Sequence, residues 1–297
     1  MRAPCLNHRV QRFSLGWACC VAALLGIAGC GADLYQQRID ATRAMFAHQE
    51  QLNQNLQGAW GDQEVGISLR VPTQFLLMPP PVKPAAGAAA DKGKPGSDKG
   101  TSGDKGDTKS GSDEDIIDDR QPTYMNIGLP GLRGAFRAPL KAAGDKNSAI
   151  EGEGFIYVLT NHHLADQPEQ AGDFKKNVAQ ILGDALHKSI DKNDWRENDR
   201  FPPEAKAKQS FVKSLSYDTL ILNSEEPIAG YYREFTAYMY TQGSIQVVVL
   251  TVFPKDVEPS EKLNDRLPLC LETLTVSGDK LLLPSTGGVQ SSNSPTF

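Results

Sequence analysis

FTAYMYTQGSIQVVVLTVFP, residues 235–254, consists of two runs of mostly aromatic and aliphatic side chains separated by the turn Thr241-Gln-Gly-Ser. This pattern predicts a β-hairpin. The second run, Ile245 to Phe253, is almost entirely apolar, so we expect a central strand that is covered on both faces. Pro254 should end this strand, because proline cannot donate a hydrogen bond to a neighbouring strand.

The segments around the hairpin predict a sheet with helices packed on it. Residues 153–164 (EGFIYVLTNHHL) and 217–223 (YDTLILN) are typical of strands, and residues 59–81 predict one or two more. Apolar residues recur at helical spacing in 173–188, behind a candidate cap at Asp173, and in 260–274. The sequence therefore predicts an α+β fold, an antiparallel sheet covered by helices.

The order of these elements, from Ala59 to Val276, resembles the PsbP-like sandwich of small lumenal and envelope proteins. The matching parts are ISLRVPTQF (67–75), the hairpin at 235–254, and the helix SEKLNDRLPLCLETL (260–274). Domains of this family usually bind or stabilise larger assemblies. The resemblance therefore implies a non-enzymatic role.

One long tract cannot belong to a folded core. Residues 84–115 contain no large apolar side chain and repeat Asp-Lys-Gly three times. Such a polyampholyte cannot offset the entropy cost of ordering, so we predict a disordered insertion over 84–120 within a single domain at 59–283. Residues 284–297 are predicted to be a flexible tail.

The N-terminus has the features of an export signal. Basic residues at 2, 9 and 12 precede an apolar run from Phe13 to Gly29, and LGIAGC (25–30) resembles the lipobox of bacterial lipoproteins. The resemblance implies that residues 1–29 are a signal peptide and that Cys30 carries lipid. A plain signal peptide or an uncleaved membrane anchor are the alternatives. Residue 31 is not Asp, which by the same resemblance favours the outer membrane, facing the periplasm.

The segment 30–58 is predicted to be a lipidated N-terminus followed by a helical spacer. Asp33 can cap a helix that continues to Gln57, because helix-forming residues fill this stretch and Gly58 ends it. A continuous helix would be about 36 Å long at ~1.5 Å per residue. It could hold the domain away from the membrane; its apolar stripe is too thin to predict a coiled coil, and packing against the main domain is the more ordinary alternative.

The net charge and the cysteine positions argue against several kinds of partner and site. A net charge of −5 gives no field that attracts polyanions, so we expect no nucleic-acid partner. Besides Cys30, the cysteines lie in the predicted signal peptide, except Cys270, which stands among leucines and is predicted to be buried. Neither a disulfide within the mature domain nor a cysteine-based zinc site is expected, and no cofactor is predicted.

The stretch VLTNHHLAD (158–166) resembles the histidine segment of trypsin-like envelope proteases of the Deg type. The resemblance implies His163 as general base and Asp218, in YDTLILN, as the orienting carboxylate. The mechanism also needs a serine on a glycine-rich turn with oxyanion-binding N–H groups. Ser277 and Ser285 stand in the wrong order relative to their glycines. We therefore assign no catalytic residue; a degenerate or active hydrolase is the alternative function.

A metal site is the other interpretation of the adjacent histidines. His162 and His163 would point to opposite faces of a strand and could not bind one ion, unless they lie on a loop. The further candidate ligands, Asp166 and the helical pair Asp184 and His187, have no diagnostic spacing. No metal ligand is assigned. The sequence favours a lipid-anchored envelope protein that binds or scaffolds a partner protein.

Overall fold

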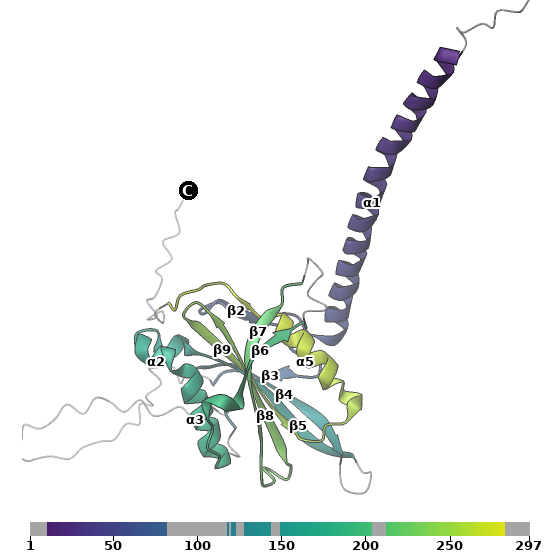
Figure 1. Cartoon of the computed structure of the whole chain (residues 1–297). Helices are drawn as coiled ribbons and strands as arrows, with labels where there is room; N and C mark the ends of the chain where they lie inside the picture. The colour runs from purple at the N-terminus through teal and green to yellow at the C-terminus, as the bar shows by residue number, and fades with distance from the viewer. Residues whose placement is uncertain are drawn as a thin grey trace, which may run out of the picture.

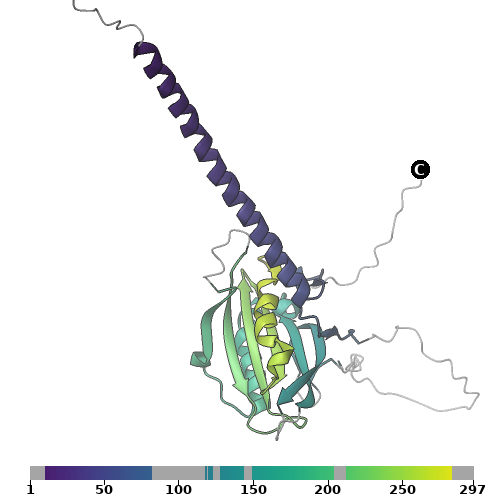
Figure 2. The ribbon, with the colours of Figure 1, turned by 90° about the vertical axis from the view of Figure 1, so that its right-hand side faces the viewer.

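The structure is a computed structural model of the whole chain, and it describes residues 11–81, 118, 120–122, 128–143, 149–203 and 212–282, without the side chains of residues 11–32, 143, 149 and 150. A twisted sheet forms the middle of the domain, and helices lie on both sides of it (Figures 1 and 2). One long helix, α1, projects away from the domain. The predicted α+β class with an antiparallel sheet is confirmed.

The main sheet has seven strands in the order β3-β4-β5-β9-β8-β7-β6, and every neighbouring pair is antiparallel. Their bounds are β3 Leu76–Leu77, β4 Leu132–Ala143, β5 Ala149–Thr160, β6 Trp195–Phe201, β7 Leu215–Asn223, β8 Arg233–Gln242 and β9 Ile245–Pro254.

The predicted hairpin is the pair β8 and β9, joined at Gly243. Gly243 has φ +59°, a conformation that glycine adopts without steric cost. β9 lies between β5 and β8 in the centre of the sheet, and nine of its ten residues are buried. The prediction of a central strand that is covered on both faces is confirmed, and the strand ends at Pro254 as expected.

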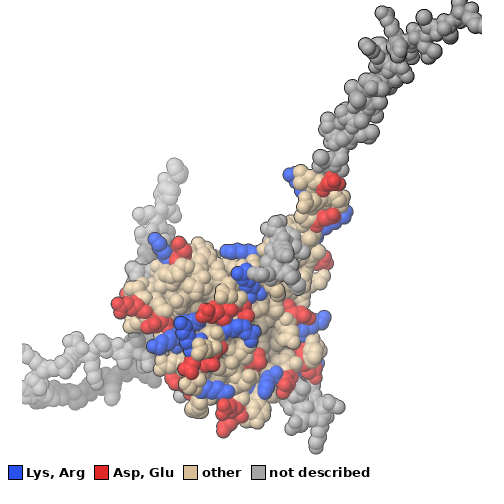
Figure 3. Space-filling view, viewed as in Figure 1, with Lys and Arg blue, Asp and Glu red and all other residues tan. Residues whose placement is uncertain are grey.

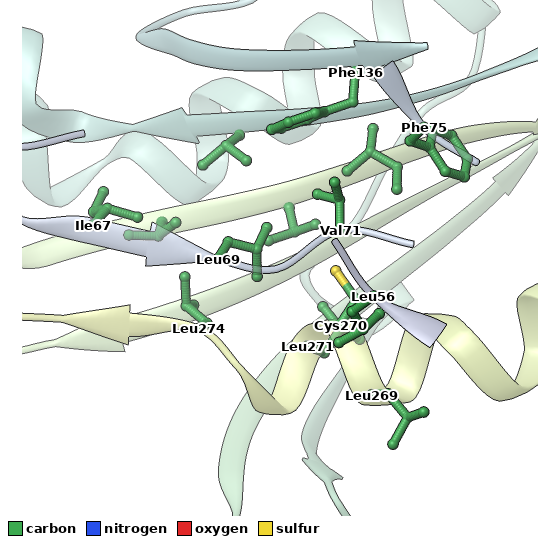
Figure 4. Packing of buried hydrophobic residues seen from close by; sticks show 14 of the residues in the cluster. Leu56, Ile67, Leu69, Val71, Phe75, Phe136, Leu269, Cys270, Leu271 and Leu274 are labelled. Carbon is green, nitrogen blue, oxygen red and sulfur yellow. The ribbon is translucent and has the colours of Figure 1, made fainter. Parts of the chain in front are cut away.

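A small second sheet and the helix α5 (Leu263–Glu272) cover one face of the main sheet. The small sheet contains β1 (Trp60–Asp62), β2 (Ile67–Leu69) and β10 (Thr275–Val276), in the order β1-β2-β10. Cys270 and Leu271 of α5 lie in the core between these layers (Figure 4). β2 and β10 pair although about 200 residues separate them, so the beginning and the end of the domain meet in one sheet.

The helices α2 (Pro168–Gly172) and α3 (Phe174–Leu186) cover the opposite face. Phe174, Val178 and Leu182 of α3 are buried at helical spacing, which is why this helix packs along one stripe. The predicted helix at 173–188 is confirmed, with Asp173 at its N-cap but without a side-chain capping hydrogen bond.

Short 3-10 helices lie at three connections: η3 (Asn161–Leu164) after β5, η4 (Lys192–Asp194) before β6, and η5 (Pro259–Glu261) before α5. The N-cap of α5 is Lys262, and Pro268 lies inside the helix without ending it.

The first helix, α1, extends from Gln11 to Asn55. It contains the predicted spacer as far as Asn55, two residues short of the predicted end at Gln57, and it continues through Asp33, so this residue does not cap it. Leu52 and Leu56, at the end of the spacer, are buried in the core of the domain. Apart from Asp118 and Arg120, the predicted insertion 84–120 lies outside the described residues, and so does the tail 284–297.

Candidate functional site

The stretch after β5 is held by Asn161, the first residue of η3. Its side-chain Nδ2 donates to the carbonyl oxygens of Ala171 (3.2 Å) and Ser244 (2.9 Å), and its Oδ1 accepts from the N–H of Gln246 (3.0 Å). The residue is fully buried. Asn161 therefore fixes the end of β5 to α2 and to the turn between β8 and β9. The sequence pattern did not indicate this role for Asn161.

His163 lies on the surface beside this anchor. Its Nδ1 is 3.1 Å from the carbonyl oxygen of Thr160, to which it donates, and its ring meets the ring of Phe174 edge to face at 6.1 Å. Gly131 packs so closely here that a Cβ would lie 2.6 Å from the same Nδ1. The imidazole is thus engaged in packing and in a hydrogen bond to the backbone.

Asp218 is not a partner of His163. It lies on β7, which is separated from β5 by β9 and β8, so about 14 Å of sheet lies between the two strands at ~4.8 Å per strand. Its carboxylate Oδ2 is 2.6 Å from the Nζ of Lys175 on α3. The structure therefore does not bring together the base and the carboxylate of the trypsin-like alternative.

The two serines considered as nucleophiles do not complete such a site. Ser277 donates a hydrogen bond from its hydroxyl to the carbonyl oxygen of Gly66 (2.9 Å), at the edge of the small sheet. Ser285 lies outside the described residues.

The histidine pair does not converge on one point either. His162 is buried at 3% exposure, whereas His163 is exposed. Asp166 and His187 are also exposed, and His187 forms the C-cap of α3. In the part of the chain that the structure describes, no group of three or more His, Cys, Asp or Glu side chains is arranged to hold a metal ion.

A pocket of about 400 Å³ lies beside the start of α3 and the connection to β6. Its lining includes Lys175, Lys176, Lys192, Asp173, Asp191 and Trp195. The Nζ of Lys175 is 4.7 Å from the centre of the Trp195 ring, so this ammonium group already has an aromatic and a carboxylate partner. Both lysines and aspartates line the pocket, so its charge does not favour one class of ligand. The face seen in Figure 3 likewise mixes positive and negative side chains.

A larger groove of about 750 Å³ lies between α1 and α5. In it the Nε2 of His48 is 2.8 Å from the Oε1 of Glu272, whose side chain is 5% exposed. Near the same junction, Arg266 of α5 contacts Asn55 through its Nε at 3.4 Å. These polar contacts join the projecting helix to the domain.

The predicted lipidation site, Cys30, falls within α1, in the portion whose side chains the structure does not describe. Among the described residues, none of the helices combines the length and the apolar character needed to cross a bilayer.

Comparison with known proteins does not identify a family. No family model and no curated protein matches the chain. Among solved structures it is similar to a protein from Bacteroides thetaiotaomicron VPI-5482, determined at 1.50 Å resolution, with 10% sequence identity and a TM-score of 0.30. The match covers 74% of this chain and 48% of the other, so the chain spans about half the length of that protein. A similarity of this size implies nothing about function.

Proposed function

We propose that the protein is a bacterial lipoprotein of the cell envelope, anchored through Cys30 in the outer membrane and facing the periplasm. In this proposal α1 is a stalk, and the α+β domain binds or scaffolds an envelope protein without catalysing a reaction. The finer assignment of the domain as a PsbP-like sandwich belongs to the same proposal. It is supported by the antiparallel sheet with helices on both faces.

The observation that carries the proposal is the position of α1. From Asp33 to Gln51 no residue of this helix is buried, and the domain holds the helix only near its end, through the polar contacts of His48 and Asn55 and the burial of Leu52. The part before His48 begins three residues after Cys30 and is about 22 Å long at ~1.5 Å per residue. A lipid on Cys30 would therefore place the domain well clear of the membrane surface.

A catalytic role has less support. His163 and Asp218, the residues of the hydrolase alternative, have separate partners in Thr160 and Lys175. The buried neighbour of His163, Asn161, has all its side-chain hydrogen bonds within the backbone framework of the domain. The stretch that resembles a protease thus has a structural explanation.

Metabolic labelling with an alkyne analogue of palmitate tests the anchor. The wild-type protein should be labelled and should need detergent for extraction from membranes, whereas Cys30→Ala should be unlabelled, since acyl chains contribute ~0.8 kcal/mol per buried methylene. Cys20→Ala is the matched control, because it removes a cysteine from the predicted signal peptide only. Labelling of Cys30→Ala, or loss of labelling in Cys20→Ala, would contradict the proposal. Separation of inner and outer membranes by density tests the location.

A further inference from the structure

The projecting part of α1 carries a mainly apolar stripe that the domain does not cover. Tyr35, Ile39, Thr42 and Phe46 follow one another at spacings of four, three and four residues, which places them on one side of a helix. Tyr35 is 67% exposed and Phe46 is 64% exposed. We call these four residues the outer stripe.

The outer stripe faces away from the domain. His48 contacts Glu272 of α5, and Leu52 is buried in the core, so these two residues mark the side of α1 that faces the domain. At about 100° per residue, they lie roughly 160° and 120° around the helix from Phe46. A second helix can therefore pack along the outer stripe without meeting the domain.

The spacing of the outer stripe is that of the seam along which two helices pack side by side. One arginine lies on each of its borders, Arg38 along one side and Arg43 along the other, and both are exposed. Arg43 has only a loose contact with Asp40 of the same helix, at 3.6 Å between side chains that are 75% and 58% exposed. Figure 3 shows positive and negative side chains among uncharged ones on this part of α1.

We propose that the outer stripe is the docking surface for an amphipathic helix of another protein, whose own apolar seam is bordered by glutamate or aspartate. Acidic borders would lie opposite Arg38 and Arg43, in the positions where charges determine which helices pair. The inference goes beyond the proposed function. It does not depend on acylation of Cys30, because the stripe is exposed on the helix itself.

Charge disfavours two other possible occupants of the outer stripe, a second copy of α1 and a membrane surface. In a parallel pair of copies, Arg38 of one stalk would lie beside Arg43 of the other, because residues five apart on such helices face each other across the seam. A helix that lies on a membrane is usually rich in Lys and Arg. Here Asp33 and Asp40 offset the two arginines between residues 33 and 46.

Two synthetic peptides of three heptads provide the test. Both carry Leu and Ile along the seam; one has Glu at the border positions and the other Lys. The full-length protein in detergent should bind the acidic peptide at least tenfold more tightly than the basic one, measured by fluorescence anisotropy.

The double variant Tyr35→Gln/Phe46→Gln should bind the acidic peptide at least tenfold more weakly than the wild type, while Arg38→Glu/Arg43→Glu should reverse the preference. Gln37→Glu, on the opposite side of α1, is the control and should bind like the wild type.

Each contrary result overturns the proposal. Equal binding of both peptides, binding of neither, or binding that survives the loss of Tyr35 and Phe46 would show that the stripe does not select an acidic helix. Self-association in sedimentation experiments that disappears in Tyr35→Gln/Phe46→Gln would assign the stripe to a second copy. A photoreactive side chain at position 46 that crosslinks only to phospholipid in intact cells would assign it to the membrane.

Discussion

The Nε2 of His48, on α1, lies 2.8 Å from the Oε1 of Glu272, the last residue of α5. This contact joins two elements that are 224 residues apart in the sequence. It lies next to Leu52, where α1 enters the core. The angle of the stalk is therefore fixed by polar contacts at His48 and Asn55 and by the burial of Leu52, all close to the end of the helix.

The first prediction concerns this junction. His48→Ala should lower the free energy of unfolding by about 0.5–3 kcal/mol, because it removes a partner from a carboxylate that is almost fully buried. Hydrogen exchange should rise in residues 44–55 more than in β9. Arg43→Ala is the control, because it breaks only the exposed contact with Asp40 and should not change stability measurably. Unchanged exchange in the end of α1 would show that the contacts of Leu52, Leu56 and Asn55 hold the stalk without His48.

The second prediction concerns stability in acid. Burial by itself raises the pKa of Asp62, but the hydrogen bond and charge of Arg133, with the N–H groups of Val65 and Glu64, bring the pKa below its ordinary value of 3.8. The Asp62 carboxylate therefore binds a proton more readily in the unfolded chain than in the folded protein. The stabilisation from Asp62 is present above pH 3.8 and is lost as the pH falls through the lower pKa of the folded state.

Urea unfolding between pH 2 and 6 measures this contribution. The stability of Asp62→Asn should depend less on pH below pH 4 than that of the wild type. Arg133→Met should instead destabilise most at neutral pH, because it leaves a partly buried carboxylate without its cation. If the acid dependence of Asp62→Asn matches that of the wild type, the pKa of Asp62 is not lowered in the folded state.

The third prediction uses Cys270 as a probe of the core. This thiol is fully buried, and burial raises its pKa well above the ordinary value. Because the thiolate is the reactive form, an aromatic disulfide reagent should modify Cys270 at least ~100-fold more slowly in the native protein than in urea. Rapid modification under native conditions would mean that α5 separates readily from the main sheet.

The sequence predicted the centre of the fold well. In the hairpin at 235–254 and in α3, the spacing of apolar residues follows directly from which side chains are buried. The sequence of each segment was therefore sufficient to predict it. β4 was missed although its residues alternate between buried and exposed from Arg137 to Ala142. Pro139 lies within it, and proline usually argues against a strand. It is tolerated because it lies beyond the two residues of β4 that pair with β3.

Other elements depend on partners that are distant in the sequence. β6 (WRENDRF) is mostly charged and forms an edge of the sheet only because β7 is there to pair with it. β10 has two residues, too few for a recognisable pattern, and it is defined by its pairing with β2. Likewise, nothing in the sequence showed that Lys175 would reach Asp218, because helix and strand meet only in the folded domain.

The last prediction returns to the stretch after β5. Asn161→Ala should lower the free energy of unfolding by about 2–4 kcal/mol, because it leaves the partly buried N–H of Gln246 and the carbonyl groups of Ala171 and Ser244 without their partner. Asn161→Asp should cost at least as much, since a carboxylate keeps the acceptor for Gln246 but turns oxygen toward two carbonyl oxygens. His163→Ala is the comparison: its exposed ring should contribute less than about 1 kcal/mol. Urea unfolding of the three variants distinguishes the two roles. The assignment would be wrong if His163→Ala were the most destabilising of the three variants. It would also be wrong if the protein were labelled stoichiometrically by a serine-hydrolase probe and His163→Ala abolished this labelling.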